Sequence, residues 1–84
     1  MNGERIRPGD IVQHFKGGIY LVIITEAYWH EDKEKNDRLV IYRSALDNKV
    51  CVRPYDMFCS EVDRQKYPGV KQQYRFEVID KISL

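Results

Sequence analysis

Hydrophobic residues along this chain occur in short runs, and most of these runs alternate with polar residues. The most regular alternation covers residues 73–80, where Tyr74, Phe76 and Val78 share one side and charged residues take the other. A period of two residues is typical of a β-strand with one buried face. Four earlier segments also look extended: 9–15, 19–28, 38–46 and 49–54. The pattern therefore predicts five short strands.

Residues that favour tight turns separate these segments. Gly17-Gly18 lies between the first two, and Asp47-Asn48 lies between the third and fourth. Asp-Asn fits a two-residue hairpin turn, because both residue types tolerate positive φ. Such a turn would pair Tyr42 with Arg53, since turn length sets register. The core side of this hairpin would then carry Ile41, Ala45, Val50 and Val52.

Two features complete the predicted architecture. The segment 19–28 is apolar on both alternating faces, which is typical of a central strand in a curled sheet or of a strand at an interface. Pro54 should end the fourth strand, and 55–58 is long enough for one helical turn, expected to pack Met57 and Phe58 under the sheet. We predict a mostly β fold, a small five-stranded, partly open SH3-like barrel with one short helical turn. The alternative is an antiparallel sheet closed by dimerisation.

The length of 84 residues indicates a single domain over 1–84, with 1–8 expected as a flexible lead-in. A domain of this size buries only roughly 60 to 65% of its unfolded surface, so its core is thin. We therefore expect a homo-oligomer, with a dimer favoured. The longest apolar run, 19–25, is far too short to cross a bilayer, so no membrane partner and a cytoplasmic location are expected.

Charge restricts the classes of partner. Fourteen basic and thirteen acidic residues give a net charge of +1, which provides no general field for a long nucleic acid. One local excess of positive charge lies within 63–75, where basic and aromatic residues are interleaved in a way suited to single-stranded nucleic acid. Its candidate contact residues are Lys66, Tyr67, Lys71, Tyr74 and Arg75.

Two motifs of the chain resemble those of a small bacterial and phage domain family of unknown function. The first is H-[FY]-K-G-x-x-Y-x-V, present as H-F-K-G-G-I-Y-L-V at 14–22, and the second is V-R-P-x-x-M-F, present as V-R-P-Y-D-M-F at 52–58. Between them, Ala27, His30, Val40 and Tyr42 also match the family pattern. The resemblance spans roughly 14–76 and implies a compact β domain in bacteria or their phages. It implies no activity.

The residue types that carry catalysis or hold metals are sparse. A structural zinc site takes four nitrogen or sulfur ligands, and the available candidates lack the usual spacing: His14, His30, Cys51 and Cys59. No nucleophile elbow, phosphate loop or H-E-x-x-H motif is present. We therefore expect no metal, no cofactor and no enzymatic activity.

A binding role has more support in the sequence. Tyr42 beside Arg53 would place an aromatic ring next to a guanidinium, a pair that can stack on a base and hold a phosphate. The structural alternative makes Tyr42 a barrel residue and Arg53 an ion-pair partner of Asp56 or Glu61. The remaining candidate ligand-binding residues are His14, Lys16, Tyr20, Trp29 and His30.

Three functions remain open from the sequence. The first is a non-enzymatic domain that holds a nucleotide-like anionic small molecule, which in a phage could sequester a host signalling nucleotide. The second is a protein–protein interaction module that uses a sheet edge or an aromatic surface. The third is single-stranded nucleic-acid binding through residues 63–75. Fold type alone does not choose among them.

Overall fold

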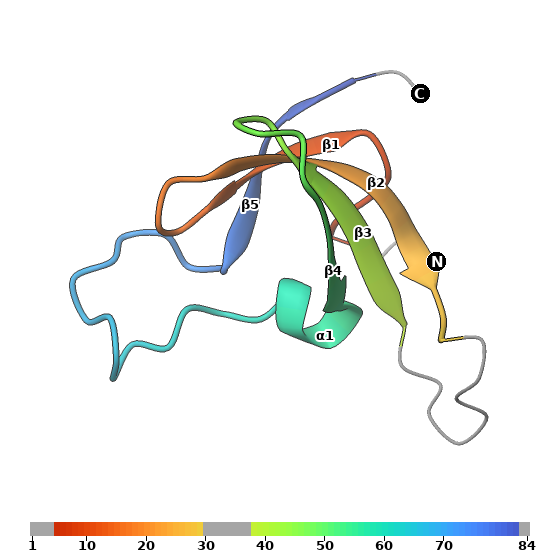
Figure 1. The fold of residues 1–84 in the computed structure, drawn as a ribbon. Helices are drawn as coiled ribbons and strands as arrows, with labels where there is room; N and C mark the ends of the chain where they lie inside the picture. Colours follow the sequence, from red (N-terminus) through yellow and green to blue (C-terminus); the bar gives the residue numbers. More distant parts are fainter. Residues whose placement is uncertain (1–4, 30–37, 83–84) are drawn as a thin grey trace.

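The computed structural model describes residues 5–29 and 38–82. They form one five-stranded antiparallel sheet that arches over a single short helix and is not closed (Figure 1). The strands run in the order β4-β3-β2-β1-β5 across the sheet. The mostly β, partly open barrel with one helical turn is therefore confirmed. Its elements are β1 (Asp10–His14), β2 (Ile19–Ala27), β3 (Leu39–Ser44), β4 (Val50–Pro54), α1 (Tyr55–Phe58) and β5 (Phe76–Lys81).

The turn between β1 and β2 forms where the glycines predict it. The backbone N–H of His14 donates to the carbonyl of Gly18 at 2.7 Å, and that of Gly17 donates back to His14 at 2.8 Å. Gly17 has a φ of 108°, which side chains with a Cβ rarely adopt. The turn pairs Val12 with Tyr20 and so directs both side chains towards the inner face of the sheet.

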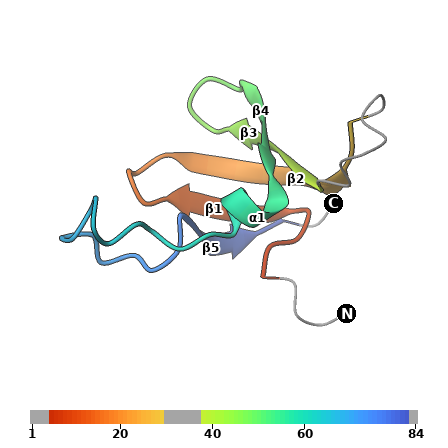
Figure 2. The ribbon, with the colours of Figure 1, turned by 90° about the horizontal axis from the view of Figure 1, so that it is seen from below.

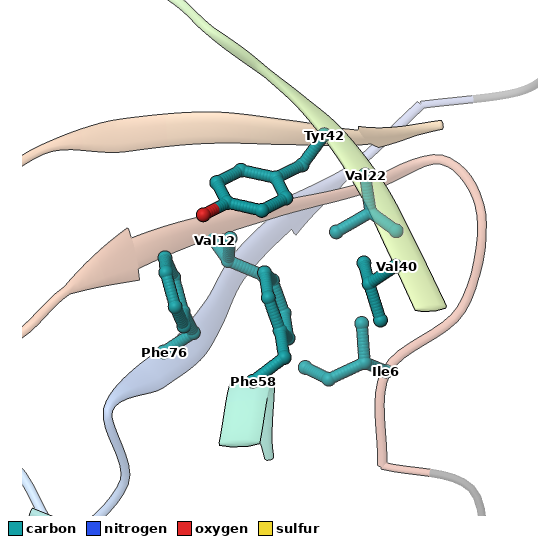
Figure 3. Close-up of a cluster of buried hydrophobic side chains, with 7 residues drawn as sticks. All are labelled: Ile6, Val12, Val22, Val40, Tyr42, Phe58 and Phe76. Carbon is teal, nitrogen blue, oxygen red and sulfur yellow. The ribbon is translucent and has the colours of Figure 1, made fainter. Parts of the chain in front are cut away.

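The core lies on the concave face of the sheet, against α1. Figure 3 shows the rings of Phe58 and Phe76 side by side beneath Tyr42, with the Tyr42 hydroxyl pointing away from the aliphatic part of the cluster. The Phe58 and Phe76 rings are stacked at 4.0 Å between centroids, with 3° between their planes. Phe58 is fully buried as predicted, whereas Met57 is 46% exposed, so only one of the two residues expected under the sheet packs there. The buried cluster comprises Ile6, Val12, Val22, Val40, Tyr42, Phe58 and Phe76.

The predicted pairing of β3 with β4 is wrong by two residues. Tyr42 lies opposite Cys51, and Arg53 lies opposite Val40. The reversal is longer than a two-residue turn, because the backbone N–H of Ser44 donates to Lys49 O and that of Asn48 donates to Ser44 O. Side-chain oxygens add to this longer loop, since Ser44 Oγ and the Asp47 carboxylate accept backbone N–H groups within it.

The predicted core side of this hairpin is also wrong. Val50 is 63% exposed and Val52 is 50% exposed, and Ala45 is exposed in the loop. The inward face instead carries Val40 and Tyr42, because the sheet curls around α1 and encloses the opposite set of alternating positions.

Two irregular segments extend the core. In the segment expected as a flexible lead-in, residues 5–8 lie within the described part, and Ile6 is fully buried. Residues 59–75 link α1 to β5 and are tied together by backbone hydrogen bonds from Val62 to Gln73 O and from Arg75 to Ser60 O, both 2.9 Å. Figures 1 and 2 show this linker extending to the same side of the sheet as the β1–β2 turn. The described residues include no helix long and apolar enough to span a membrane.

Candidate functional site

A hollow of about 420 Å³ lies where the β1–β2 turn meets the linker. The end of β1 and the turn contribute His14, Phe15 and Lys16, and β4 contributes Arg53 from its inner face. The linker closes the other side of the hollow. Its contribution is Asp63, Lys66, Tyr67 and Arg75. We call this hollow the basic pocket.

Positive charge dominates the basic pocket. Four cations line it, Lys16, Arg53, Lys66 and Arg75, against one carboxylate, that of Asp63. Within residues 5–29 and 38–82, an ion pair joins only Lys49 to Asp47, far along the chain on the β3–β4 loop. The pocket cations therefore have no carboxylate within 4 Å in the described part of the chain, although the whole protein is almost neutral.

Both pocket arginines are oriented through their Nε atoms. Arg53 Nε donates to the Tyr42 hydroxyl at 3.2 Å, and Arg75 Nε donates to Ser60 Oγ at 3.2 Å. Among the described residues, the terminal nitrogens of these two guanidinium groups have no hydrogen-bond partner. The ion pairs that the structural alternative assigned to Arg53, with Asp56 or Glu61, do not form between these described residues. The two terminal nitrogens of each guanidinium group are thus able to donate side by side to a ligand in the pocket, and we call them the end-on donor pair.

His14 is held as a neutral ring with a defined donor. Its Nδ1 accepts the backbone N–H of Lys16 at 3.1 Å, so the ring proton resides on Nε2. Burial lowers the pKa of His14 below its ordinary value, and the nearby charges of Arg53, Arg75 and Lys16 lower it further. The imidazole therefore adds an uncharged N–H donor among the cations.

Aromatic rings form one wall of the basic pocket. Phe15 stacks on His14 at 4.5 Å and meets the Tyr67 ring edge-on at 4.9 Å. The Lys16 ammonium lies 5.2 Å from the centre of the Tyr67 ring. A hydrogen bond from Lys16 lowers the pKa of the Tyr67 phenol, and the charges of Lys16, Lys66 and Arg75 act in the same direction. The cations and the aromatic surface thus belong to one site.

Asp63 builds the part of the linker that faces the pocket. Its Oδ1 accepts the backbone N–H groups of Gln65 at 3.0 Å and Lys66 at 3.4 Å. Its carbonyl accepts the N–H of Tyr67 at 2.8 Å. These bonds form a compact turn that presents Lys66 and Tyr67 to the pocket. The carboxylate is therefore already engaged by the backbone.

The structure unites parts of two sites that the sequence treated as separate. From the predicted ligand site, His14, Lys16 and Arg53 line the basic pocket. From the predicted nucleic-acid strip, three more residues line it: Lys66, Tyr67 and Arg75. Sequence reasoning missed Phe15 and Asp63, although Phe15 is part of the first motif and Asp63 has the spacing of a side-chain-capped turn.

The other predicted site residues lie elsewhere. Tyr42 is 4% exposed and reaches the site only through its hydroxyl, while Tyr20 packs edge-on against it at 5.3 Å. Trp29 is 56% exposed beyond the end of β2, and His30 lies outside the described residues. Of the strip residues, Lys71 is exposed and does not line the pocket. Tyr74 is covered by the Arg5 guanidinium, 4.0 Å from its ring centre.

A second hollow, of about 550 Å³, has a different character. It mixes cations with carboxylates, and the fold already uses several of these groups. Asp10 accepts the backbone N–H of Arg7 at 2.9 Å, and Glu77 accepts those of Gln73 and Tyr74. Arg5 donates to the carbonyl of Phe76 at 2.9 Å. The basic pocket is therefore the better candidate site. The second hollow is lined by Arg5, Arg7, Asp10, Glu77, Val78 and Lys81.

The described ranges contain no group of three His, Cys, Asp or Glu side chains placed to hold a metal ion. The fold and the pocket together define a small, partly open β-barrel domain with a basic, aromatic-walled hollow at one end. The chain matches the model of a family described as "Protein of unknown function (DUF1653)" over residues 10–78, and it belongs to that family. Comparisons with curated proteins and with solved structures give no match.

Proposed function

We propose that this domain is a non-enzymatic binding module that holds a nucleotide-like anionic small molecule in the basic pocket. The observation that carries the proposal is the convergence of four cations without carboxylate partners, within the described residues, on a hollow walled by Phe15 and Tyr67. Converging cations that lack carboxylate partners favour an external anion, and two of the four, Arg53 and Arg75, are half-buried. An adjacent aromatic surface favours a base.

The volume and the distribution of charge favour a small ligand over a nucleic-acid strand. Small-molecule pockets span about 300 to 1,000 Å³, and 420 Å³ lies near the lower end of this range. The candidate residues of the predicted strip are divided: Lys66, Tyr67 and Arg75 line the pocket, whereas Lys71 does not and the Arg5 guanidinium covers the Tyr74 ring. This division favours a ligand in the pocket over a strand along 63–75. In a signalling setting, a domain of this kind would sequester a nucleotide rather than convert it.

Arg53 provides the direct test. In the Arg53→Lys variant the charge is kept, but the planar pair of donors is lost, so nucleotide affinity should fall at least about tenfold. The matched control is Arg43→Lys, because Arg43 is exposed on the outer face of β3, away from the pocket. Calorimetric titration with a panel of linear and cyclic adenosine and guanosine nucleotides measures both variants.

Two outcomes would contradict the proposal. One is that no nucleotide in the panel binds the unmodified protein with a dissociation constant below the millimolar range. The other is that Arg53→Lys lowers the melting temperature but binds as tightly as Arg43→Lys, which would make Arg53 a structural residue tied to Tyr42.

A further inference from the structure

We propose that the basic pocket recognises a terminal phosphate, the dianionic monoester of a mononucleotide, in preference to a phosphodiester. This inference rests on the proposed function and deepens it by naming the ligand class. It depends on how many donors converge on the pocket, how they are oriented and how much of their charge is uncompensated.

The number of donors suits a group with three free oxygens. The end-on donor pairs of Arg53 and Arg75 are available, because within the described residues these guanidinium groups donate only through Nε, to Tyr42 and Ser60 respectively. The Lys16 ammonium and the Nε2–H of His14 add two further donors from the β1–β2 turn. A phosphodiester offers two non-bridging oxygens to such a set, whereas a monoester offers three.

The net charge of the pocket suits a dianion. Four cations face one carboxylate, and that carboxylate accepts two backbone N–H groups. Burial is the largest cause of the lowered pKa of His14, and a hydrogen bond from Lys16 is the largest cause of the lowered pKa of Tyr67, but the charges of Arg75 and Lys16 lower both pKa values further. A monoanionic diester would leave most of this charge uncompensated, whereas a dianion compensates more of it.

The neutral state of His14 is part of the recognition. Protonation would put a proton on Nδ1 and remove the acceptor of the Lys16 backbone N–H. The groups that face this ring are cationic or aromatic: Arg53 from β4, Arg75 from the linker, Lys16 from the turn, and the rings of Phe15 and Phe76. An uncharged donor can therefore bind a phosphate oxygen without disturbing the turn.

The test compares ligands that share one nucleoside. Adenosine 5′-monophosphate is titrated against adenosine 3′,5′-cyclic monophosphate and against the methyl ester of adenosine 5′-monophosphate, and the guanosine series is measured in parallel. The methyl ester keeps the shape of the monophosphate and removes its second charge. We expect the monophosphate to bind at least about tenfold more tightly than either diester.

The pH dependence provides a second signature. A phosphomonoester loses its second proton near pH 6, so the ratio of monophosphate to cyclic-nucleotide affinity should rise between about pH 5 and 7.5.

The outcomes separate the two proposals. If a diester binds as tightly as the monophosphate, or if the ratio is flat with pH, the terminal-phosphate inference is wrong and the proposed function stands. If no nucleotide of either kind binds, both proposals fail. Inorganic phosphate that displaces the monophosphate in competition would support recognition through the phosphate group.

Discussion

Asp63 has two opposite effects on the basic pocket. Its carboxylate accepts the N–H groups of Gln65 and Lys66 and thereby builds the turn that presents Tyr67. The same carboxylate is the one negative charge among the residues that line the hollow. Structure and electrostatics at this residue can be separated, because an amide oxygen accepts the same hydrogen bonds without the charge.

The Asp63→Asn variant should therefore bind an anion more tightly while the turn is kept. We expect nucleotide affinity to rise roughly two- to fivefold, in keeping with the modest strength of exposed charge interactions, and the gain to shrink at high salt. Asp47→Asn is the matched control, since Asp47 caps a comparable turn by accepting the N–H of Lys49 at 3.1 Å. Equal affinity changes in both variants would contradict a local field at the pocket.

His14 predicts a specific dependence of stability on pH. Its pKa in the folded protein is lowered by burial and by Arg53, Arg75 and Lys16, so the unfolded chain binds a proton more readily. Stability from this group is therefore fully present above the ordinary histidine pKa, about 6.5, and is lost as the pH falls through the lowered value. Melting temperatures between pH 7.5 and 5 should fall more steeply for the unmodified protein than for His14→Gln, whose amide oxygen can accept the same Lys16 N–H. Parallel curves for the two proteins would show that His14 does not contribute.

At the scale of elements, the β3–β4 loop decides which residues meet. Asn48 adopts a φ of 61°, in the left-handed region. The Asn48→Gly variant should thus be neutral or slightly more stable, whereas Asn48→Val should lose about 1 to 2 kcal/mol of unfolding free energy. Urea unfolding measures both. If Asn48→Val had the same unfolding free energy as Asn48→Gly, residue 48 would not adopt a positive φ.

The same loop shows how far sequence reasoning could reach. The strands, the first turn and the helical turn follow from local signals: the alternation in 73–80, the glycines at 17 and 18, and Pro54 before α1. The register of β3 with β4 could not be derived in this way, because Asp47-Asn48 also fits a longer loop closed by Ser44. An error of two residues keeps the faces of the strands, so Tyr42 and Arg53 still meet although they are not direct partners.

The candidate site shows a second limit. His14, Lys16 and Arg53 could be recognised from their residue types, but the sequence carried no signal that the linker folds back against the β1–β2 turn. That contact is made by several long-range interactions: the side-chain amide of Gln72 donates to Gln13 O at 2.9 Å, the backbone N–H of Phe15 donates to Arg75 O at 3.0 Å, and the Phe15 ring meets Tyr67. Long-range tertiary contacts of this kind bring residues of the predicted ligand site and of the predicted strip 63–75 into one pocket, and local sequence patterns do not reveal such contacts.

At the scale of the whole molecule, the outer face of the sheet remains partly apolar. One row of paired residues crosses all five strands: Val50, Arg43, Leu21, Ile11 and Asp80, from β4 to β5. The adjacent row, Ile24, Ile41 and Val52, is aliphatic, with Ile24 42% and Val52 50% exposed. A copy rotated by 180° about an axis that runs along the strands between β2 and β1 would bring Arg43 near the partner's Asp80 and Leu21 near the partner's Ile11. The charge pattern of this face is thus self-complementary.

We therefore expect a homodimer through this outer face, which would also extend the thin core of the single chain. Sedimentation at micromolar concentration should give a mass near twice 10.0 kDa. The Val52→Lys variant should sediment as a single chain with little change in secondary structure, because a lysine at a half-exposed position stays hydrated in the monomer but meets apolar surface in the dimer. Leu46→Lys is the matched control, since Leu46 is 94% exposed in the β3–β4 loop and lies outside the two rows. A mass near 10.0 kDa for the unmodified protein at every concentration would rule out the dimer. If both lysine variants sedimented as single chains, the interface would instead include the β3–β4 loop.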